Sequence, residues 1–249
     1  MNIGILIQAR LGSTRLPGKI LLPFYGEQAI IDILLEKLHQ ATEVPIIVAT
    51  TTSPANDLLV SHLESKGELV FRGSENDVLD RFIQAAELHH LDGIVRICSD
   101  NPFIDAKGIQ LLIEKALTSN TQYIGFRING LPSIKTHFGF WGEYVTRQAL
   151  KHVADTTDEP LAHEHVTIHI YSHPEAYCCE WIDCPDFIQG RNDIRLTVDT
   201  QEDFANAQKV YADLVKSHPG FDLEAVIRYL DQHEELKSSM KRIIEQNAK

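Results

Sequence analysis

Residues 8–19 read Gln-Ala-Arg-Leu-Gly-Ser-Thr-Arg-Leu-Pro-Gly-Lys, directly after an apolar run at residues 3–7. The apolar run predicts a buried strand, so the basic segment is expected to be the loop at the carboxyl end of that strand. The loop carries three cations, two glycines and two hydroxyl groups. Glycines let the backbone approach a phosphate closely, and guanidinium and ammonium groups donate to its oxygens. Arg10, Arg15 and Lys19 are therefore candidates for holding phosphate groups.

The charge distribution sets this loop apart from the rest of the chain. The first 26 residues contain no acid and carry a formal charge of +3, whereas the whole chain carries −12, so the remainder carries −15. A cationic loop on an acidic protein favours a local pocket for a small, highly charged anion such as a nucleoside triphosphate. The alternative is a solvated basic turn. The segment lacks both the P-loop spacing Gly-x-x-x-x-Gly-Lys-Ser/Thr and the dinucleotide-binding spacing Gly-x-Gly-x-x-Gly.

After the loop, short apolar runs alternate with amphipathic segments of helical length. Strands are expected at residues 45–50, 68–71 and 93–98, and helices at 30–39, 56–65, 75–89 and 106–118, the third of these capped by Ser74 with Asp77 in its first turn. This alternation predicts an α/β fold with a mostly parallel sheet that helices cover on both faces. Ligands of such sheets bind beyond the carboxyl ends of the strands. Thr50, the tripeptide Arg72-Gly73-Ser74 and Asp100 all lie at predicted strand ends, so we expect them near the basic loop.

The middle of the chain is less regular, and its end is helical. Further strands are expected at residues 123–127, 136–141, 177–182 and 194–198, and helices at 144–153, 164–171, 202–216, 223–231 and 234–247. The sequence contains no internal repeat, low-complexity stretch or linker. It therefore predicts a single domain over residues 1–249, with an insertion around residues 125–185.

Two aspartates follow predicted strands in distant parts of the chain. Asp100 ends the segment Ile94-Val-Arg-Ile-Cys-Ser-Asp, and Asp199 holds a similar place in Arg195-Leu-Thr-Val-Asp-Thr. Mg²⁺ usually takes one or two protein carboxylates and completes its shell with substrate phosphates and water. If the two strand ends are neighbours, this pair predicts a metal site beside the phosphate loop. The alternative is that each aspartate caps the turn or helix that follows it.

Bulk composition limits the class of protein. The excess of acidic residues argues against nonspecific binding to DNA or RNA. No apolar run approaches the roughly 18 residues of a membrane span, and the N-terminus lacks the features of a signal peptide. The four cysteines show no CxxC spacing and are interpreted as reduced thiols rather than disulfides or a zinc site. We therefore expect a cytoplasmic protein without a nucleic-acid or membrane partner.

Several segments together resemble one family. The opening motif at residues 8–19 is similar to that of the cytidylyltransferases that activate acidic sugars, such as CMP-Kdo synthetase and acylneuraminate cytidylyltransferase. The branch called spore coat polysaccharide biosynthesis protein F is the most similar. Further matching segments are Val48-Ala-Thr-Thr51, Val70-Phe-Arg-Gly-Ser-Glu-Asn-Asp-Val-Leu79, Val95-Arg-Ile-x-x-Asp-x-Pro-x-Ile-Asp105, Glu164-His-Val-Thr167 and Arg195-Leu-Thr-Val-Asp-Thr200. They extend over about residues 3–205.

The resemblance implies a nucleotide-diphospho-sugar transferase fold, which is a Rossmann-like three-layer sandwich with a mostly parallel mixed sheet. It implies Mg²⁺-dependent transfer of CMP from CTP to an acidic, nonulosonic-type sugar for surface polysaccharide biosynthesis, with release of pyrophosphate. The catalytic roles fall on Arg10, Arg15, Lys19 and Asp100, and the metal roles on Asp100 and Asp199. The nucleotide-binding roles fall on Ala9, Arg10, Gly12, Ser13, Arg15, Lys19, Thr50, Arg72, Gly73 and Ser74. A homodimer is also implied, with residues 125–185 as its interface.

The sequence departs from the family pattern at Thr136-His-Phe-Gly-Phe-Trp-Gly-Glu143, where the family has an acidic segment similar to Gly-Leu-Asp-x-Glu. His137 and aromatic residues stand in place of those acids. The acceptor therefore stays open, and the alternatives are another nucleotide or acceptor, or a nucleotide-binding homologue without catalytic activity. The aromatic side chains could instead pack in the core or at a dimer contact. His163 and His165 are the candidates for a general base, although a histidine in a helical segment more often packs or faces solvent.

Overall fold

The computed structural model describes residues 1–247, and its central feature is a mixed sheet of eight strands. The strands lie in the order β10-β7-β9-β6-β1-β4-β5, with β8 paired to β7 outside this path. Their bounds are β1 Ile3–Gln8, β4 Ile46–Thr51, β5 Leu69–Gly73, β6 Gly93–Cys98, β7 Tyr123–Ile128, β8 Leu131–Pro132, β9 Glu143–Thr146 and β10 Cys179–Asp183. The pairs β1–β4, β1–β6, β4–β5 and β7–β10 are parallel, whereas β9 runs antiparallel to β6 and β7.

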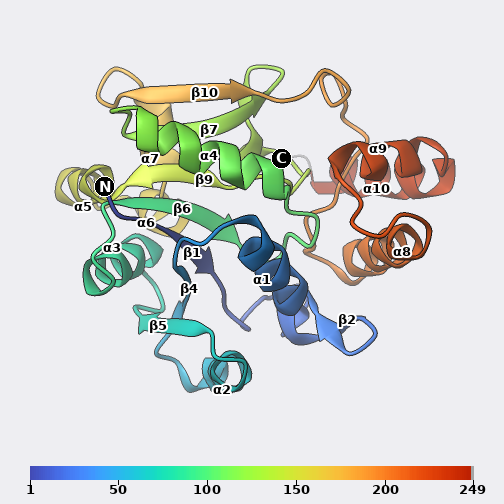
Figure 1. Cartoon of the computed structure of the whole chain (residues 1–249), viewed down its shortest axis with the longest axis horizontal. Helices are drawn as coiled ribbons and strands as arrows, with labels where there is room; N and C mark the ends of the chain where they lie inside the picture. The colour runs from blue at the N-terminus through green and yellow to red at the C-terminus, as the bar shows by residue number, and fades with distance from the viewer. Residues whose placement is uncertain (248–249) are drawn as a thin grey trace.

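Helices cover both faces of this sheet (Figure 1). One apolar cluster joins β1 and β6 to α1 (Ile30–Ala41), α4 (Ala106–Thr118), α8 (Gln201–Ser217), α9 (Leu223–Asp231) and α10 (Glu234–Asn247). A second cluster joins the opposite face to α3 (Val78–Leu88), α5 (Arg147–Thr156), α6 (Pro160–His165) and α7 (Ile168–Ser172). Helix α2 (Asp57–Ser65) lies beside β5 at the edge of the sheet. Because both faces are buried, the apolar run of β1 is continuous rather than alternating.

The smaller elements connect these layers. Strands β2 (Pro23–Tyr25) and β3 (Gln28–Ala29) form a separate hairpin, and short 3₁₀ turns occur at η1 (Lys19–Leu21), η2 (Pro54–Asn56) and η3 (Ser133–Lys135). None of the helices within residues 1–247 is both long and apolar enough to span a bilayer.

The register of the parallel strands brings their carboxyl ends to one edge. Gln8 at the end of β1 lies opposite Cys98 of β6 and Ala49 of β4. Thr51 at the end of β4 lies opposite Gly73 of β5. The loops after these strands therefore meet at a common edge, as the alternating pattern predicts for this α/β fold.

The middle of the chain differs from the sequence-based expectation. Residues 136–141 do not form a strand; the antiparallel strand is β9, which begins at Glu143. Gly139 has a φ of 68°, a left-handed conformation that interrupts an extended run. Phe138, Phe140 and Trp141 pack in the core, so the alternative role for the aromatic residues of this segment is confirmed. Residues 194–198 also lie outside the regular strands.

Three helix boundaries were also predicted wrongly. The helix expected at residues 144–153 begins only at Arg147, because the Thr146 side chain accepts a hydrogen bond from Ala149 N–H and caps it. The residues expected to form one helix at 164–171 belong instead to two helices, α6 and α7. The chain turns between them at Val166, which has a positive φ. Asp77 rather than Ser74 is the N-cap of α3, since its carboxylate accepts from Asp80 N–H. The Ser74 hydroxyl instead accepts a hydrogen bond from the backbone N–H of Asp77, before the helix begins.

Candidate active site

The basic loop after β1 turns back so that Lys19 points into the protein. The backbone N–H of Leu11 donates to Asn56 Oδ1 (2.8 Å), and the loop closes where Gly18 N–H donates to the Leu11 carbonyl oxygen (3.0 Å). Gly18 has a φ of 68°, which glycine adopts without steric cost, and η1 begins at the next residue. Lys19 is consequently only 8% exposed, which is rare for a lysine unless its charge is paired.

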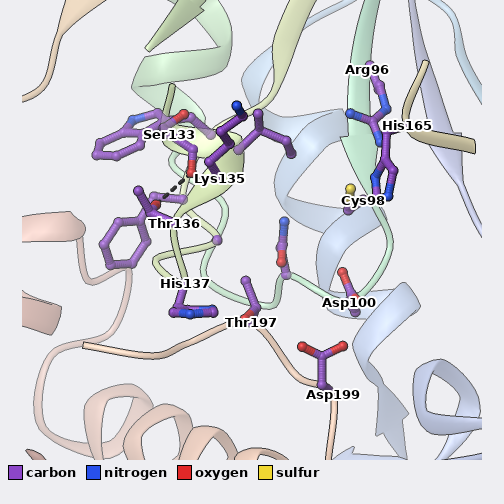
Figure 2. A pocket seen from close by; sticks show the side chains of 15 residues that line it. Arg96, Cys98, Asp100, Ser133, Lys135, Thr136, His137, His165, Thr197 and Asp199 are labelled. Atoms are coloured by element: carbon purple, nitrogen blue, oxygen red, sulfur yellow. Dashed lines mark hydrogen bonds between the residues drawn. The ribbon is translucent and has the colours of Figure 1, made fainter. Parts of the chain in front are cut away.

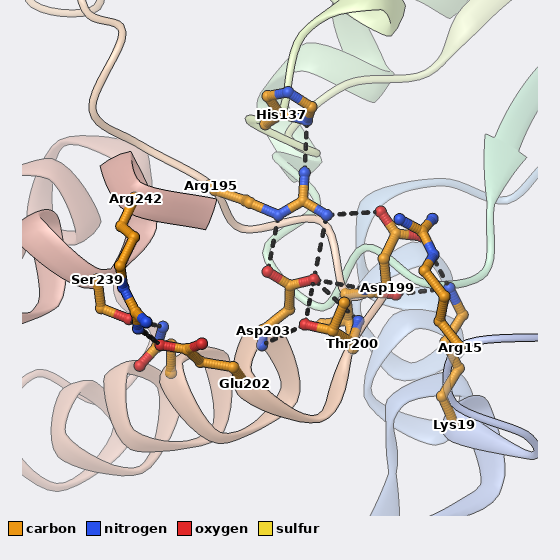
Figure 3. Close-up of polar contacts among 12 residues, drawn as sticks. Arg15, Lys19, His137, Arg195, Asp199, Thr200, Glu202, Asp203, Ser239 and Arg242 are labelled. Carbon is orange, nitrogen blue, oxygen red and sulfur yellow. Dashed lines mark hydrogen bonds and ion pairs between the residues drawn. The ribbon is translucent and has the colours of Figure 1, made fainter. Parts of the chain in front are cut away.

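The ammonium group of Lys19 joins the two predicted metal ligands. Its Nζ atom lies 2.7 Å from Asp100 Oδ2 and 3.5 Å from Asp199 Oδ1, and it donates to the carbonyl oxygen of Val198 (2.5 Å). Arg15 Nη2 reaches the same Asp199 oxygen at 3.0 Å (Figure 3). The two carboxylate oxygens therefore lie no farther apart than the sum of the two lysine distances. The structure brings together four residues that the sequence analysis expected at one site.

A buried ion pair fixes the position of Asp199 (Figure 3). Arg195 donates through Nε and Nη2 to the carboxylate of Asp203, at 2.7 and 3.1 Å, and its Nη2 also donates to Asp199 Oδ2 at 2.8 Å. Asp203 Oδ2 accepts further bonds from the backbone N–H groups of Asp199 and Thr200. Burial favours a raised pKa for Asp203, but hydrogen bonds from the Arg195 guanidinium outweigh it and lower the pKa below its usual value. Asp203 therefore stays ionised and holds Arg195 against Asp199.

A cavity of about 340 Å³ opens beside the two aspartates (Figure 2). Its lining comes from the end of β6, from residues 133–141, from the end of α6 and from the segment that precedes α8. Asp100 and Asp199 lie at one end, and Figure 2 shows Lys135 and Arg96 toward the other. The two carboxylates thus stand between the basic loop and the cavity.

Two buried polar groups that line the cavity have no partner among the described residues. They are the Nε atom of Arg96 and the Oδ1 atom of Asn101. Both atoms have almost no solvent-accessible surface, so they lie behind the cavity wall rather than at its surface. Burial raises the pKa of the Cys98 thiol, also in the wall, to about 11, which keeps it neutral. Burial, then the charge of Arg195, lowers the pKa of His137.

The remaining phosphate-loop candidates differ in their exposure. Arg10 is about half exposed, and its Nη2 atom is 4.0 Å from the Glu164 carboxylate of α6. Gly12 is exposed, and a Cβ atom built on it meets no atom within 4 Å, so the space above it is open. Ala9 is buried and donates from its backbone to the Ala49 carbonyl oxygen at 3.3 Å. Ser13 follows Gly12 on the same loop, and its backbone N–H donates to the Leu11 carbonyl oxygen at 2.9 Å.

The other four nucleotide-binding candidates lie at the ends of β4 and β5, away from the cavity lining. The Arg72 guanidinium donates to the backbone oxygens of Thr51 and Ser53 and to Asp57, so it fastens the connection from β4 to α2. Thr50 is fully buried, and its hydroxyl has no partner among the described residues. Gly73 ends β5 and Ser74 follows it. These residues belong neither to the cavity lining nor to the group that Lys19 forms with Arg15, Asp100 and Asp199. Their nucleotide-binding role stays a prediction.

The carboxylates of Asp100 and Asp199 fit a magnesium ion better than a metal held by the protein alone. Both side chains are about a quarter exposed and supply hard oxygen donors. Within residues 1–247 no group of three or more His, Cys, Asp or Glu side chains is placed to hold a metal ion. Zinc sites need three or four protein ligands, whereas Mg²⁺ is commonly held by one or two carboxylates, substrate phosphates and water.

Sequence reasoning missed much of the supporting structure around these carboxylates. Asp203 lies three residues after Thr200, and this capping-box spacing was a signal for a helix start, which α8 confirms. Its second role, orienting Arg195, depends on contacts that no local pattern shows. Lys135 and Arg96 were likewise not singled out, because the cavity gathers them from separate strands and turns.

A basic loop after the first strand of the sheet, with two aspartates facing it, is the arrangement expected of a nucleotidyltransferase. The family model described as cytidylyltransferase matches residues 4–249, and the chain belongs to this family. It is 37% identical to an uncharacterized protein of Methanocaldococcus jannaschii, over 96% of this chain and 94% of that one. It is 32% identical to the spore coat polysaccharide biosynthesis protein SpsF of Bacillus subtilis, over 84% and 86% of the two chains. The solved structure of a cytidylyltransferase from Leptospira borgpetersenii superposes with a TM-score of 0.81 at 29% identity, covering 95% of this chain and 96% of that one. The family resemblance and the nucleotidyltransferase fold are thereby confirmed.

Proposed function

We propose that this protein is a Mg²⁺-dependent enzyme that transfers CMP from CTP to an acidic sugar and releases pyrophosphate. The observation that carries the proposal is the convergence of Lys19, Asp100 and Asp199. One carboxylate oxygen of each aspartate lies within 3.5 Å of Lys19 Nζ, and both aspartates line the cavity. A nucleotidyl transfer needs cations to neutralise the triphosphate and carboxylates to hold a metal beside it. Belonging to the cytidylyltransferase family supports CTP as the nucleotide.

The arrangement suggests a division between the two substrates. The triphosphate would lie over the basic loop, where Arg10, Arg15 and the open space above Gly12 face solvent. The acceptor would occupy the cavity on the other side of Asp100 and Asp199. The α-phosphorus would then lie at the boundary, close to both aspartates. Holding the two reactants in line across such a boundary is a major part of catalysis in phosphoryl-type transfers.

The residues of the chain itself have distinct tasks in this reaction. Lys19 and Arg15 would stabilise the negative charge of the departing pyrophosphate, as preorganised donors that need no rearrangement during the reaction. Asp203 and Arg195 would hold Asp199 in its metal-binding orientation. A magnesium ion bound by Asp100 and Asp199 would supply Lewis-acid stabilisation of the phosphate oxygens.

An acidic acceptor is supported by the charge of the cavity. Lys135, which forms no ion pair among the described residues, lines the part of it that lies away from the aspartates, whereas the charge of the neighbouring Arg96 is paired with Glu143 (Figure 2). Guanidinium and ammonium groups are the usual partners of a carboxylate. The B. subtilis relative is named for polysaccharide biosynthesis, and we extend that role to this chain as part of the proposal. A cytoplasmic location, where CTP is made, and a homodimer through residues 125–185 belong to the same proposal.

Pyrophosphate release tests the proposal directly. With CTP, MgCl₂ and a panel of 2-keto-3-deoxy acid sugars, the wild-type protein should release pyrophosphate, and omission of Mg²⁺ or of the sugar should abolish it. Lys19→Met and Asp100→Asn should each lower kcat by about 100-fold or more. Lys209→Met, on an exposed face of α8, is the matched control and should keep full activity.

Three results would contradict the proposal in whole or in part. Full activity in both site variants would show that the reaction takes place elsewhere. Calorimetric binding of CTP without pyrophosphate release across the sugar panel would identify a nucleotide-binding protein without transferase activity. Release of pyrophosphate from UTP or ATP but not from CTP would change the proposed nucleotide, while the proposed site would stand.

A further inference from the structure

The connection between α6 and α7 contains a strained turn at the cavity wall. Val166 has φ 49° and ψ −57°, and the backbone N–H of Thr167 donates to the His165 carbonyl oxygen at 2.5 Å. These values describe a γ-turn with positive φ, the rare and strained form. For a β-branched residue that conformation is a true outlier. Strain of this kind persists only where the surrounding structure enforces it, and it is concentrated at functional sites.

A buried hydrogen-bond network around Glu143 holds this turn in place. The Thr167 hydroxyl donates to Glu143 Oε2 at 2.9 Å, and the same oxygen accepts from Arg96 Nη1 at 2.8 Å. Tyr123 donates through its hydroxyl to the other oxygen, Glu143 Oε1, at 2.6 Å. All four residues are at most 5% exposed. Val166 itself is fully buried, so the turn is fixed on both sides.

The consequence of the turn is the position of His165. Its side chain lines the cavity, and Figure 2 shows it beside Arg96 and Cys98, on the side that faces Asp100. The imidazole has no hydrogen-bond partner among the described residues, although His163, two residues earlier, contacts Asp77 and the Thr157 carbonyl oxygen. A rigid backbone thus presents an unpaired imidazole to the space where an acceptor would lie.

We propose that His165 is the general base that takes the proton from the attacking hydroxyl of the acceptor. This inference rests on the proposed transferase function. As the acceptor oxygen forms its bond to the α-phosphorus of the nucleotide, the hydroxyl proton moves to an imidazole nitrogen. The bond from the α-phosphorus to the pyrophosphate oxygen breaks, and the pyrophosphate leaves with that electron pair. The imidazolium proton then passes to solvent through the cavity. Thr167 and Glu143 are positioning residues, because they act only through the turn that aims His165.

Other ionisable groups share the cavity with His165. They are Arg96 and Cys98 on β6, Asp100 after it, Lys135 and His137 on the 133–141 segment, and Asp199 before α8. Glu143 lies beneath Arg96, and Glu164 adjoins His165 in the chain. Imidazole is the only type of side chain in this set whose unperturbed pKa lies between pH 5 and 8. A base role requires His165 to be neutral, so kcat/KM should fall on the acidic side and reach a plateau as the imidazole loses its proton.

The test compares His165→Gln with His163→Gln, a matched variant on the same helix whose ring faces Asp77 instead of the cavity. Pyrophosphate release is followed from pH 5.5 to 9 with CTP, MgCl₂ and the sugar of the panel that the wild type uses. We expect His165→Gln to lower kcat by about 100-fold, to leave the KM of the sugar within threefold, and to lose the acidic limb of the kcat/KM profile. CTP affinity, measured by calorimetry, should not change. His163→Gln should keep both the rate and the acidic limb.

Thr167→Val adds a readout for the positioning network. It should lower kcat but keep the acidic limb, because the imidazole is still present and only its aim is disturbed. His165→Gln with a kcat within threefold of the wild type, or with an intact acidic limb, would overturn the assignment. A raised sugar KM with an unchanged kcat would also overturn it, in favour of a binding role. Failure of the transferase proposal gives a different result, since the wild type itself would then release no pyrophosphate with any sugar of the panel.

Discussion

At the scale of single residues, Asp203 illustrates how a buried charge supports a site by holding the residues that form it. Its carboxylate is 2% exposed and accepts from Arg195 and from the Thr200 backbone N–H and side-chain hydroxyl. Removing one member of a buried ion pair leaves the other charge uncompensated. The same carboxylate caps the first turn of α8, so a substitution disturbs the helix and Asp199 together.

We predict that Asp203→Asn destabilises the fold by about 3 kcal/mol at neutral pH, as measured by urea unfolding. The pKa of Asp203 is lower in the folded state than its usual value of 3.8, so its contribution is complete above about pH 4. It is lost as the pH falls through the lower, folded pKa. The difference between wild type and variant should therefore be constant from pH 5 to 7 and narrow below pH 4.

The control for this variant is Glu224→Gln. Glu224 pairs with Arg228 on the exposed face of α9, and exposed pairs of this kind contribute about 0–1 kcal/mol. Equal losses in the two variants would mean that burial does not govern the Asp203 pair. A difference that widens below pH 4 would reverse the sign derived from its pKa.

At the scale of elements, Lys37 connects three parts of the fold. It lies on α1, its Nζ donates to the Pro102 carbonyl oxygen at 3.2 Å, and it faces the rings of Tyr211 and Phe221 at 5.5 and 4.8 Å. Pro102 belongs to the loop that follows Asp100, so α1 supports the back of the site. Burial lowers the pKa of Lys37 to about 8, against the opposing charges of Asp105 and Glu36.

We predict that Lys37→Met gains stability relative to the wild type at neutral pH, and that this gain disappears in alkaline solution. The unfolded chain binds the Lys37 proton up to about pH 10.5, whereas the folded protein releases it near pH 8. The charged lysine therefore destabilises the fold fully below pH 8, and the cost fades as the pH rises to 10.5. The stability difference should shrink by up to about 3 kcal/mol across that window, followed by urea unfolding.

Lys107→Met provides the comparison, because the Lys107 side chain is 79% exposed at the start of α4. Its stability relative to wild type should be independent of pH between 7 and 10.5. A Lys37→Met difference that stays flat over the same range would show that the lysine keeps an ordinary pKa.

The elements that the sequence predicted well are those with a strong local pattern. Strand 93–98 and helices 106–118, 223–231 and 234–247 have the bounds that the hydrophobic periodicity gave. The strand expected at residues 136–141 does not form: the aromatic side chains there are buried, but the backbone pairs with no neighbouring strand. The backbone there bonds to distant loops instead; the Asp105 N–H, for example, donates to the Phe140 oxygen. Such contacts are long-range, and no window of sequence contains them.

At the scale of the whole molecule, the candidate site joins the first twenty residues to a segment near residue 200. Lys19 follows β1, Asp100 follows β6, and Asp199 precedes α8. The motifs of the sequence identified each of these residues, but only their pairing in the fold defines the cavity and its wall. Because the site exists only when these segments are folded together, a ligand that bridges them must stabilise the entire chain.

We therefore predict that CTP with Mg²⁺ raises the thermal midpoint of unfolding. At 100 times the dissociation constant the gain is about 2.7 kcal/mol, which corresponds to about 5–10 °C for a chain of this length. Differential scanning fluorimetry should show that EDTA removes most of the shift, because the two aspartates and the phosphates share the metal. Asp199→Asn, compared with and without ligand in the same variant, should lose the Mg²⁺-dependent part of the shift. An equal shift in EDTA, or in Asp199→Asn, would mean that CTP binds without a metal at these carboxylates.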